Sequence, residues 1–294
     1  MYSNTGRRGP LRNGGITVEK LVVGIAQWLP AAGRPELNLD AALSHVGWLA
    51  RRGCELVVLP ELWPVGLRPA TFRDDLAAGA EPLDGPRTHA LSAAAREHGV
   101  WLAAGSLPEA TPAGVYNTAP LFAPDGRLLC AHRKCHLYRA FDEHRWFLPG
   151  ASLTVCDAGA LGTVGVSICF DGDFPEVARA MRRRGAELVV HPSAYERAAE
   201  TWWDTLYPAN ALANGQWWVL ANQCGDAGGV TYLGGSCVIA PDGAVVAAAG
   251  RAAEGERPAP ELLVVRLDFT ERLQRARCEN SALWEQGRRE LHQD

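Results

Sequence analysis

The sequence predicts an α/β protein in which two mixed sheets pack face to face with helices outside. Short strand-like runs alternate with helix-like segments along the chain. Two segments, 118–129 and 235–246, each contain a strand, a Pro-Asp-Gly turn and a return strand, which is typical of a β-hairpin. The run 54–60 (CELVVLP) is echoed by 186–192 (AELVVHP), each time after Arg-Arg-Gly. These patterns alone do not distinguish the sandwich from other α/β layouts.

The first half of the chain holds clear helix and strand patterns. Apolar residues at 39, 42, 43, 46, 49 and 50 form one stripe at helical spacing, and Gly53 stands where such a helix stops. A second helix is expected to stop at Gly99. The elements expected in this half are a strand at 21–26, a helix at 38–53, a strand at 55–59, a helix at 86–98 and a strand at 100–104.

The second half places a strand directly before a cysteine. An apolar strand ends at Cys169, and glycine and aspartate residues then form a tight bend. Pro175 can occupy the first turn of a helix that runs to Gly185. Further along, a loop rich in Pro, Ala and Glu at 251–260 leads to a strand at 261–267.

Length and composition indicate one domain between two tails. The chain has 294 residues, of which 47% are hydrophobic, and this is ample for one large core. We expect residues 1–18 to be a flexible tail, or to lie across a neighbouring subunit, and to be dispensable for chemistry. Residues 19–268 are expected to form the domain. Residues 269–294 form a charged C-terminal tail that is a candidate for a subunit interface.

Charge and hydropathy exclude several classes of function. The 29 basic and 33 acidic side chains give a net charge of −4, so no nucleic-acid-binding surface is expected. Residues 1–18 lack the apolar stretch of a secretory signal, and no run approaches the roughly 18 apolar residues of a membrane helix. We therefore expect a soluble, cytoplasmic protein without nucleic-acid or membrane partners.

Of the eight cysteines, one stands in unusual surroundings. A cysteine inside an apolar run is normally a small buried hydrophobe in a reducing compartment. Cys169 instead stands at a strand-to-helix elbow, where it would project from the sheet edge and a helix N-terminus would favour its thiolate. Cys169 is therefore the candidate nucleophile, and the alternative is a buried cysteine at a strand end.

Two charged residues at strand ends are candidates for its partners. Glu61 ends a strand whose preceding run is wholly apolar, so desolvation can make its carboxylate basic enough for general-base catalysis. The alternative for Glu61 is capping a helix or pairing with an arginine. Lys134 follows the first hairpin and could direct its ammonium at an oxyanion, whereas alone it would normally be a solvated surface cation.

The residues around Lys134 also include types that bind zinc, namely Cys130, His132, Cys135 and His136. A zinc site would need these four close neighbours to converge on one point. Because alternate residues of a strand point to opposite faces, we expect no metal site here.

Motifs around the three candidate residues follow one another in a known order. They are LPELW around Glu61, YNTAPLFAPDGRLL and HRKCHL around Lys134, SICFDGDFPE around Cys169, and then VVHPSA and LANQCG. From about residue 21 to 267 the chain thus resembles the nitrilase superfamily of carbon–nitrogen hydrolases. The resemblance implies a four-layer α-β-β-α sandwich and a homodimer or higher homo-oligomer. A second glutamate of the family matches Glu143.

Chemistry and resemblance together imply a cysteine hydrolase that breaks a non-peptide carbon–nitrogen bond. A free thiol, with a pKa of about 8.5, is mostly protonated at neutral pH, so Glu61 would take its proton as Cys169 attacks the carbonyl carbon. The oxyanion would lie between the ammonium of Lys134 and the backbone N–H of Phe170. Glu61 would then protonate the departing amine and activate the water that clears the thioester. No metal, nucleotide or organic cofactor is required.

Further residues are expected to position the substrate rather than to react. Glu143 would hold the substrate nitrogen or fix Lys134. Tyr195 belongs to a group of aromatic residues near the motifs, some of which could line a pocket, although sheet packing is the commoner role. The other members of the group are Trp63, Trp146, Phe170, Trp202 and Trp203.

The residues after the nucleophile favour a small amide substrate. Nitrile-cleaving members of the superfamily typically follow the cysteine with Trp-Glu, whereas this chain has Phe170 and Asp171, as in the amidase and carbamoyl-amide branches. The expected reaction is hydrolysis of a small amide or carbamoyl amine with release of ammonia. The alternatives are a nitrilase, acyl transfer by the same triad, and a catalytically silent scaffold of the same fold.

The charges of the motifs predict a substrate without a carboxylate. Asp171 and Asp173 add to Glu61 and Glu143, while Lys134 is the cation that the motifs place with them. We expect a neutral or amine-bearing amide to be cleaved faster than an N-carbamoyl amino acid, because like charge in a desolvated site is unfavourable. The alternative is that the aspartates only cap the following helix and bond its backbone.

Overall fold

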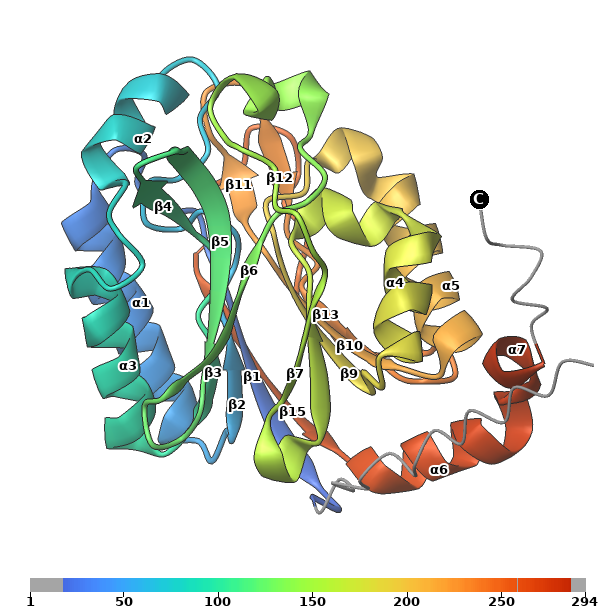
Figure 1. The fold of residues 1–294 in the computed structure, drawn as a ribbon. Coiled ribbons are helices and arrows are strands. Elements are labelled where there is room, and N and C mark those ends of the chain that lie inside the picture. Colours follow the sequence, from blue (N-terminus) through green and yellow to red (C-terminus); the bar gives the residue numbers. More distant parts are fainter. Residues whose placement is uncertain (1–17, 258, 287–294) are drawn as a thin grey trace, which may run out of the picture.

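The structure, a computed structural model, describes residues 18–257 and 259–286. Figure 1 shows two sheets that stand face to face, each covered on its outer side by helices. This is the four-layer α-β-β-α sandwich of two mixed sheets that the sequence predicts. The expectations for residues 1–17 and 287–294 fall outside the described residues.

The first sheet, called sheet A, has seven strands within the described residues. They are β1 (Leu21–Gln27), β2 (Leu56–Val58), β3 (Trp101–Ala103), β4 (Leu107–Thr111), β5 (Gly114–Phe122), β6 (Leu128–Arg133) and β15 (Glu261–Leu267). Their order is β15-β1-β2-β3-β5-β4, and β6 pairs with the other edge of β5. β1, β2 and β3 are parallel, whereas the remaining pairs are antiparallel. The hairpin expected at 118–129 is the β5–β6 pair.

The second sheet, called sheet B, has six strands. They are β7 (Thr154–Asp157), β8 (Thr163–Val166), β9 (Leu188–Ser193), β10 (Trp217–Asn222), β13 (Cys237–Ile239) and β14 (Val245–Ala248). Their order is β14-β13-β10-β9-β8-β7, with a parallel centre of β8, β9 and β10. The second expected hairpin is the β13–β14 pair. A separate two-stranded ladder joins β11 (Cys224–Asp226) to β12 (Thr231–Leu233).

Both outer layers are helical, and the described residues contain seven α-helices. They are α1 (Pro35–Ala50), α2 (Phe72–Gly79), α3 (Pro86–His98), α4 (Pro175–Arg183), α5 (Glu200–Asn214), α6 (Phe269–Asn280) and α7 (Ala282–Glu285). α1 and α3 pack together on sheet A, and α4 and α5 pack together outside sheet B. The predicted helix 86–98 matches α3, which Gly99 ends with a φ of 64°. Among the described helices, none has the length and apolar character needed to cross a membrane.

The alternation of side chains along β2 shows how the sheets divide the core. Leu56 and Val58 point to the inner core between the two sheets, whereas Val57 and Leu59 join a second core beneath α1 and α3. All four side chains are fully buried. A continuous apolar run is therefore required here, because both faces of this strand are covered.

The described residues after β15 are largely helical. α6 buries Phe269, Leu273 and Ala276, which follow one another at spacings of a single helix face. Phe269 and Leu273 belong to the core between the sheets and α5. The indole N–H of Trp217 in β10 donates to the carbonyl of Phe269 at 3.1 Å, so the start of α6 is fixed to sheet B.

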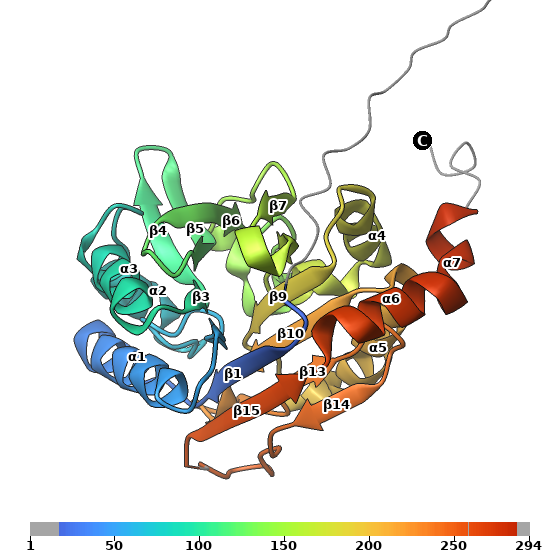
Figure 2. The ribbon, with the colours of Figure 1, turned by 90° about the horizontal axis from the view of Figure 1, so that it is seen from below.

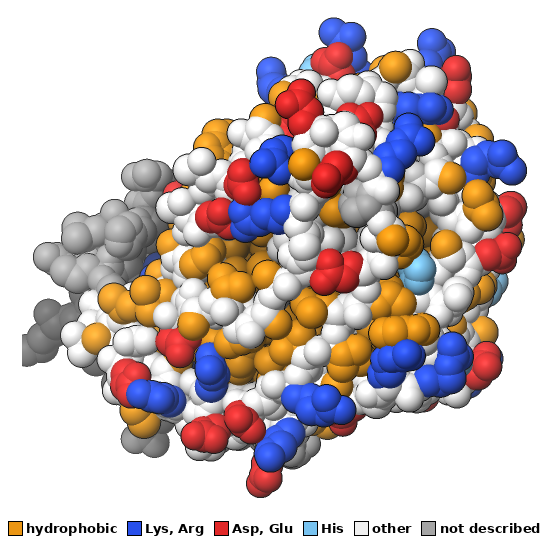
Figure 3. All heavy atoms as spheres, turned by 180° about the vertical axis from the view of Figure 1, so that it is seen from behind, with side chains coloured by type: hydrophobic (Ala, Val, Ile, Leu, Met, Phe, Trp, Pro, Cys, Tyr) orange, Lys and Arg blue, Asp and Glu red, His pale blue; other side chains and the backbone are white. Residues whose placement is uncertain are grey.

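One face of the molecule exposes the edges of both sheets. Figure 2 shows β14 and β15 on the side opposite β4, β5 and β6. Apolar side chains gather across the middle of this face and charged ones lie around its rim (Figure 3). Hydrophobic residues of these strands that remain partly exposed include Val246, Leu262 and Val264.

Candidate active site

The candidate residues lie at strand ends on one edge of the sandwich. Glu61 follows β2 and Lys134 follows β6, and these strands point the same way in sheet A. Cys169 follows β8 in sheet B. The backbone N–H of Glu61 donates to the carbonyl of Ser193 at the end of β9, over 3.2 Å. Strand ends of the two sheets therefore meet at the site.

The carboxylate of Glu61 is buried and is held by three donors. Oε1 accepts hydrogen bonds from Lys134 Nζ at 2.9 Å and from Asn117 Nδ2 at 2.8 Å. Oε2 accepts one from the backbone N–H of Ala194 at 2.9 Å. The partner of Glu61 is thus a lysine, not the arginine or helix end that was the alternative. A carboxylate fixed in this way can take and return a proton at one place.

Lys134 is fully buried between two carboxylates. Its ammonium donates to Glu61 Oε1 at 2.9 Å and to Glu143 Oε1 at 2.7 Å. Burial disfavours the charge, but Glu143 and Glu61 outweigh it and hold the pKa of Lys134 well above its ordinary value. The other oxygen of Glu143 accepts the backbone N–H of Tyr138 at 2.7 Å. Glu143 therefore contacts Lys134, which is one of the two roles expected for it.

Cys169 opens the 3₁₀ turn η4 (Cys169–Asp173) and is 8% exposed. Its φ is 46°, in the left-handed region that non-glycine residues rarely adopt. Such a backbone costs about 1–3 kcal/mol and persists where the surrounding structure enforces it, often at functional sites. α4 begins at Pro175, as the sequence predicts.

The thiol of Cys169 is held in its protonated form. Burial raises its pKa well above the ordinary value, the carboxylate of Glu61 raises it further, and the ammonium of Lys134 opposes both. The expectation that a helix N-terminus would favour the thiolate is therefore wrong. α4 begins only after η4, at Pro175, so its dipole does not outweigh the burial of the sulfur. A protonated thiol needs a base in order to react.

A small pocket brings Cys169, Glu61 and Glu143 together with aromatic side chains. It encloses about 370 Å³, its open mouth included. Five of its walls are aromatic: Tyr138, Phe141, Phe170, Tyr195 and Trp202. Phe170 and Tyr195 are thus among the aromatic residues that line the pocket. Trp63 and Trp203 are buried in the packing instead.

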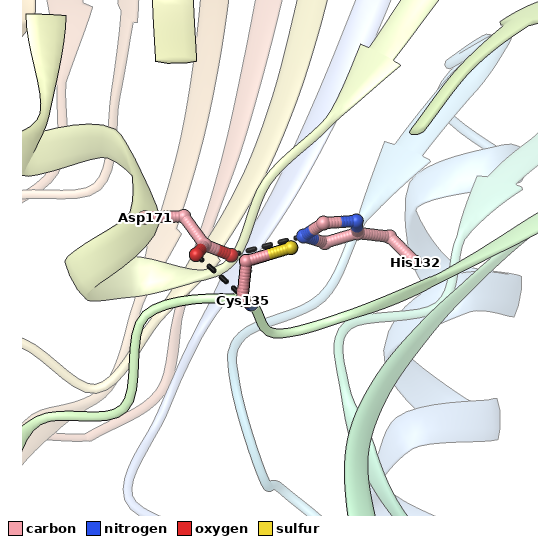
Figure 4. A group of neighbouring side chains, drawn as sticks. All are labelled: His132, Cys135 and Asp171. Atoms are coloured by element: carbon pink, nitrogen blue, oxygen red, sulfur yellow. Dashed lines mark hydrogen bonds and ion pairs between the residues drawn. The ribbon is translucent and has the colours of Figure 1, made fainter. Parts of the chain in front are cut away.

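Asp171 does not face the pocket, contrary to the expectation that it adds charge there. Its oxygens accept hydrogen bonds from His132 Nε2 at 2.9 Å and from the backbone N–H of Cys135 at 3.1 Å (Figure 4). They also accept one from His136 Nδ1 at 2.8 Å. Burial alone would raise the pKa of Asp171, but the two histidines hold it well below its ordinary value. Asp171 thus ties the segment that follows Lys134 to the turn that contains Cys169.

His132, Cys135 and Asp171 are the one trio of metal-binding residue types that the described part of the chain brings together. His132 Nε2 and Asp171 Oδ2 lie 2.9 Å apart, whereas ligands on a tetrahedral zinc ion would be separated by about 3.4 Å. The thiol of Cys135 faces the carbonyl oxygens of Arg133 and Ser152, at 3.6 and 3.5 Å. The three residues are thus arranged to form hydrogen bonds with one another and with nearby backbone, rather than to surround a zinc ion.

Asp173 does face the pocket, as expected. Oδ2 accepts the hydroxyl of Tyr195 at 3.1 Å, and Oδ1 accepts the hydroxyl of Tyr207 at 2.8 Å. Burial raises the pKa of Asp173 to about 6, against the effect of the two hydroxyls. The start of α4 has no side-chain cap, so neither Asp171 nor Asp173 caps that helix.

Comparison with known proteins agrees with this geometry. A family model described as carbon-nitrogen hydrolase matches residues 22–276. The chain belongs to the carbon–nitrogen hydrolase family. Omega-amidase NIT2-A of Xenopus laevis is 35% identical over 225 residues, which cover 72% of this chain and 79% of that protein. Human omega-amidase NIT2 is 33% identical over 224 residues, with coverages of 72% and 79%.

Solved structures of the nitrilase superfamily share the fold of this carbon–nitrogen hydrolase. Nit3 of Saccharomyces cerevisiae, a member of branch 10, has a TM-score of 0.80 at 29% identity and covers 94% of this chain and 98% of its own. An amidase from Nesterenkonia sp. AN1 in complex with butyramide has a TM-score of 0.75 at 28% identity, with coverages of 97% and 98%. In another structure of that amidase, the acetamide moiety of fluoroacetamide is added covalently at the active-site cysteine.

Several residues of this carbon–nitrogen hydrolase site were not predicted from the sequence. Asn117 and Ala194 hold the carboxylate of Glu61, and Tyr138 and Glu196 line the pocket. Asn117 and Ala194 stand in the segments YNTAP and VVHPSA, so the motifs contained the signal without assigning a role. The donor of Ala194 is a backbone N–H, which sequence cannot single out.

Proposed function

We propose that the chain is an amidase that hydrolyses a small, non-peptide amide or carbamoyl amine through a thioester on Cys169 and releases ammonia. The observation that supports this most directly is the proximity of three groups at one pocket. The thiol of Cys169 and the fixed carboxylate of Glu61 line the pocket, and the ammonium of Lys134 is hydrogen-bonded to that carboxylate. The amidases and omega-amidases among the relatives agree with an amide as substrate.

In the first half-reaction, Glu61 takes the thiol proton while the sulfur of Cys169 forms a bond to the carbonyl carbon. The carbonyl electron pair moves to oxygen, and the oxyanion is stabilised by Lys134 and by the backbone N–H of Phe170. The tetrahedral species then expels its nitrogen, which takes the proton from Glu61 and leaves as ammonia. A thioester remains on the sulfur.

In the second half-reaction, Glu61 takes a proton from water, whose oxygen attacks the thioester carbonyl. The same oxyanion site serves again. Collapse breaks the carbon–sulfur bond, and Glu61 returns its proton to the sulfur of Cys169. An amide thus gives a carboxylic acid, whereas a carbamoyl amine gives a carbamic acid, which loses carbon dioxide.

The test is release of ammonia from a panel of butyramide, a carbamoyl amine and butyronitrile. We expect ammonia from the first two, and a loss of about 10⁴–10⁶-fold in kcat for Cys169→Ala. Added hydroxylamine should divert the thioester to a hydroxamate. Ammonia from the nitrile alone, or a Cys169→Ala variant of near-normal kcat, would contradict the proposal.

Thiol labelling checks the nucleophile independently. Iodoacetamide should inactivate the enzyme by alkylating Cys169, and butyramide should protect it. Cys278, an exposed free cysteine, provides the control, because its alkylation should leave the activity unchanged. Inactivation that tracks alkylation of another cysteine would remove Cys169 from its role.

We also propose that the chain works as a homodimer or a higher homo-oligomer. The apolar surface over β14 and β15 supports this, because large exposed apolar patches on soluble proteins often mark interaction sites (Figure 3). Light scattering coupled to size exclusion should give at least twice the mass of one chain. A monomer at micromolar concentration would contradict it.

A further inference from the structure

The pocket walls carry an excess of negative charge. Four carboxylates line the pocket, those of Glu61, Glu143, Asp173 and Glu196. Lys134 lies against the first two and offsets one of the charges. Among the described lining residues there is no arginine, lysine or histidine. A low-dielectric cleft lined by one sign of charge concentrates ligands of the opposite sign.

Glu196 has the carboxylate that is best placed to meet a substrate. The other three carboxylates of the pocket have both oxygens engaged in hydrogen bonds. Glu196 is partly exposed, and its Oε1 accepts the hydroxyl of Tyr138 at 3.0 Å. Its Oε2 has no hydrogen-bond partner among the residues that the structure describes. This oxygen is therefore available to a ligand.

Basic residues around Glu196 are directed elsewhere. The guanidinium of Arg197 donates to a backbone carbonyl of the loop before β15. Arg251 is shared between Glu200 and Asp204, outside the pocket. The charge of Glu196 is thus not neutralised by either arginine.

The remaining walls also suit a cation. Tyr138 and Phe170 lie with ring centroids 5.0 Å apart, and Tyr138 and Phe141 lie 5.3 Å apart. Trp202 is 49% exposed and lines the same pocket. Aromatic faces attract an ammonium through their quadrupoles and offer nothing comparable to a carboxylate. Carboxylates and aromatic rings together form a site for a positively charged group.

We infer that the enzyme selects amides whose remaining part carries an ammonium group, and that Glu196 is the specificity residue that binds this group. The inference rests on the proposed amide hydrolysis and names its substrate class. In this arrangement the amide carbonyl lies at Cys169, and the ammonium lies between the free oxygen of Glu196 and the aromatic walls. A substrate with a carboxylate in that place would meet like charge.

Three substrates of similar length test the inference: 5-aminopentanamide, hexanamide and glutaramate, which are cationic, neutral and anionic. We expect kcat/KM to fall in this order, by about tenfold at each step, as partly desolvated charge pairs allow. Added salt should reduce the advantage of the cation, because its attraction is screened.

Glu196→Gln is the decisive variant, because glutamine keeps an acceptor for the hydroxyl of Tyr138 and removes only the charge. It should lower kcat/KM for 5-aminopentanamide about tenfold more than for hexanamide, mainly through KM. Glu196→Lys should go further and make glutaramate the better charged substrate. Glu200→Gln removes the same charge outside the pocket and should leave the order of the three substrates unchanged.

The outcomes separate this inference from the proposed function. Absence of ammonia from all three substrates would refute the amidase proposal itself. Ammonia with a preference for glutaramate would leave the amidase proposal intact and overturn the inference. An equal loss on the cationic and neutral substrates in Glu196→Gln would also overturn it, since Glu196 would then only orient Tyr138.

Discussion

Strands β2 and β9 have nearly the same sequence, but the residues at their ends contribute different groups to the proposed active site. Residues 54–60 read CELVVLP and residues 186–192 read AELVVHP, and both strands are central and parallel in their sheets. β2 is followed by Glu61, whose side chain is the proposed base. β9 ends at Ser193, whose carbonyl accepts the backbone N–H of Glu61, and Ala194 donates its own N–H to the carboxylate. One strand end thus supplies the proposed base, and the other supplies backbone that holds it.

The same division extends to the two sheets. Sheet A positions the charged side chains, Glu61 and Lys134, whereas sheet B positions the thiol of Cys169 and the backbone donor of Ala194. Changes of the charged side chains at the sheet A ends should therefore remove a chemical step, whereas changes of the sheet B residues that hold the backbone around Ala194 should loosen its geometry. The first should lower the rate more than the second.

Apart from loss of Cys169 itself, Glu61→Gln should show the largest effect. Glutamine keeps the shape but has no basic carboxylate, so thioester formation should slow by about 10⁴-fold, the upper range for general acid–base catalysis. Single-turnover kinetics with butyramide measures this step. Glu55→Gln, at the other end of the same strand run, is the matched control and should retain kcat. Thioester formation at the normal rate in Glu61→Gln would show that Glu61 is not the base.

Lys134→Met should lower kcat by about 10²–10³-fold with a smaller change in KM, because its contact to the oxyanion strengthens only in the transition state. Steady-state kinetics distinguishes the two parameters. An unchanged kcat with a raised KM would make Lys134 a binding residue.

The same variant should also destabilise the fold, because it leaves Glu61 and Glu143 buried without their counter-ion. We expect a loss of about 3–5 kcal/mol in the free energy of unfolding. Adding Glu143→Gln should recover part of that stability, since one uncompensated charge is removed, but not the rate. Urea unfolding of the single and double variants measures this. Recovery of both would mean that Lys134 acts only through stability.

Asn222→Ala probes sheet B and should have a smaller effect. Its Oδ1 accepts the N–H of Tyr195 at 2.7 Å, and its Nδ2 donates to the carbonyl of Gly234 at 2.9 Å, so it fixes the loop that presents Ala194. We expect kcat to fall about tenfold, with Glu61 left in place to react. A loss as large as that of Glu61→Gln would end the distinction between the two sheets.

The smallest expected effect is that of Asp173 on how the free energy of unfolding depends on pH. Its pKa of about 6 is above the ordinary value, so its carboxylate is less favoured in the folded chain than in the unfolded chain. Its stabilising contribution is therefore complete below about pH 4 and is lost as the pH rises through about 6. Tyr195, Tyr207, Lys134 and Asp171 are among the titratable groups that act on it.

Urea unfolding at about pH 5 and about pH 8 tests this effect. The wild type should lose about 1–2 kcal/mol relative to Asp173→Asn between the two pH values. Parallel curves for the two proteins would show that the pKa of Asp173 is ordinary.

The positions of strand ends could be predicted from the sequence, because they depend on local pattern. An apolar run followed by Pro60 and Glu61 marks the end of β2, and Pro175 marks the start of α4. The hairpins followed from their Pro-Asp-Gly turns. The order of the motifs indicated which strand ends form the proposed active site. Local signals of this kind can be recognised in a single sequence.

Contacts between distant segments could not be predicted. Asp171 was expected in the pocket. Its carboxylate instead accepts hydrogen bonds from His132 and His136, which lie far earlier in the chain. The effect expected from a helix N-terminus on Cys169 fails for a similar reason, because the burial that raises the pKa of the thiol depends on both sheets. For α6 a local signal did exist, since Phe269, Leu273 and Ala276 repeat at helical spacing within a charged segment.

The pairing of β1 with β15 has a consequence for how the chain folds while it is being synthesised. Leu21 lies opposite Leu267, and Gln27 lies opposite Glu261, so one edge of β1 is completed by a strand near the far end of the chain. Ribosomes add about 5–20 residues per second, so β1 must wait roughly 10–50 s for its partner to be made. Until then its unpaired edge can join the wrong strand. Nascent chains that stop before residue 261 should therefore depend most on chaperones.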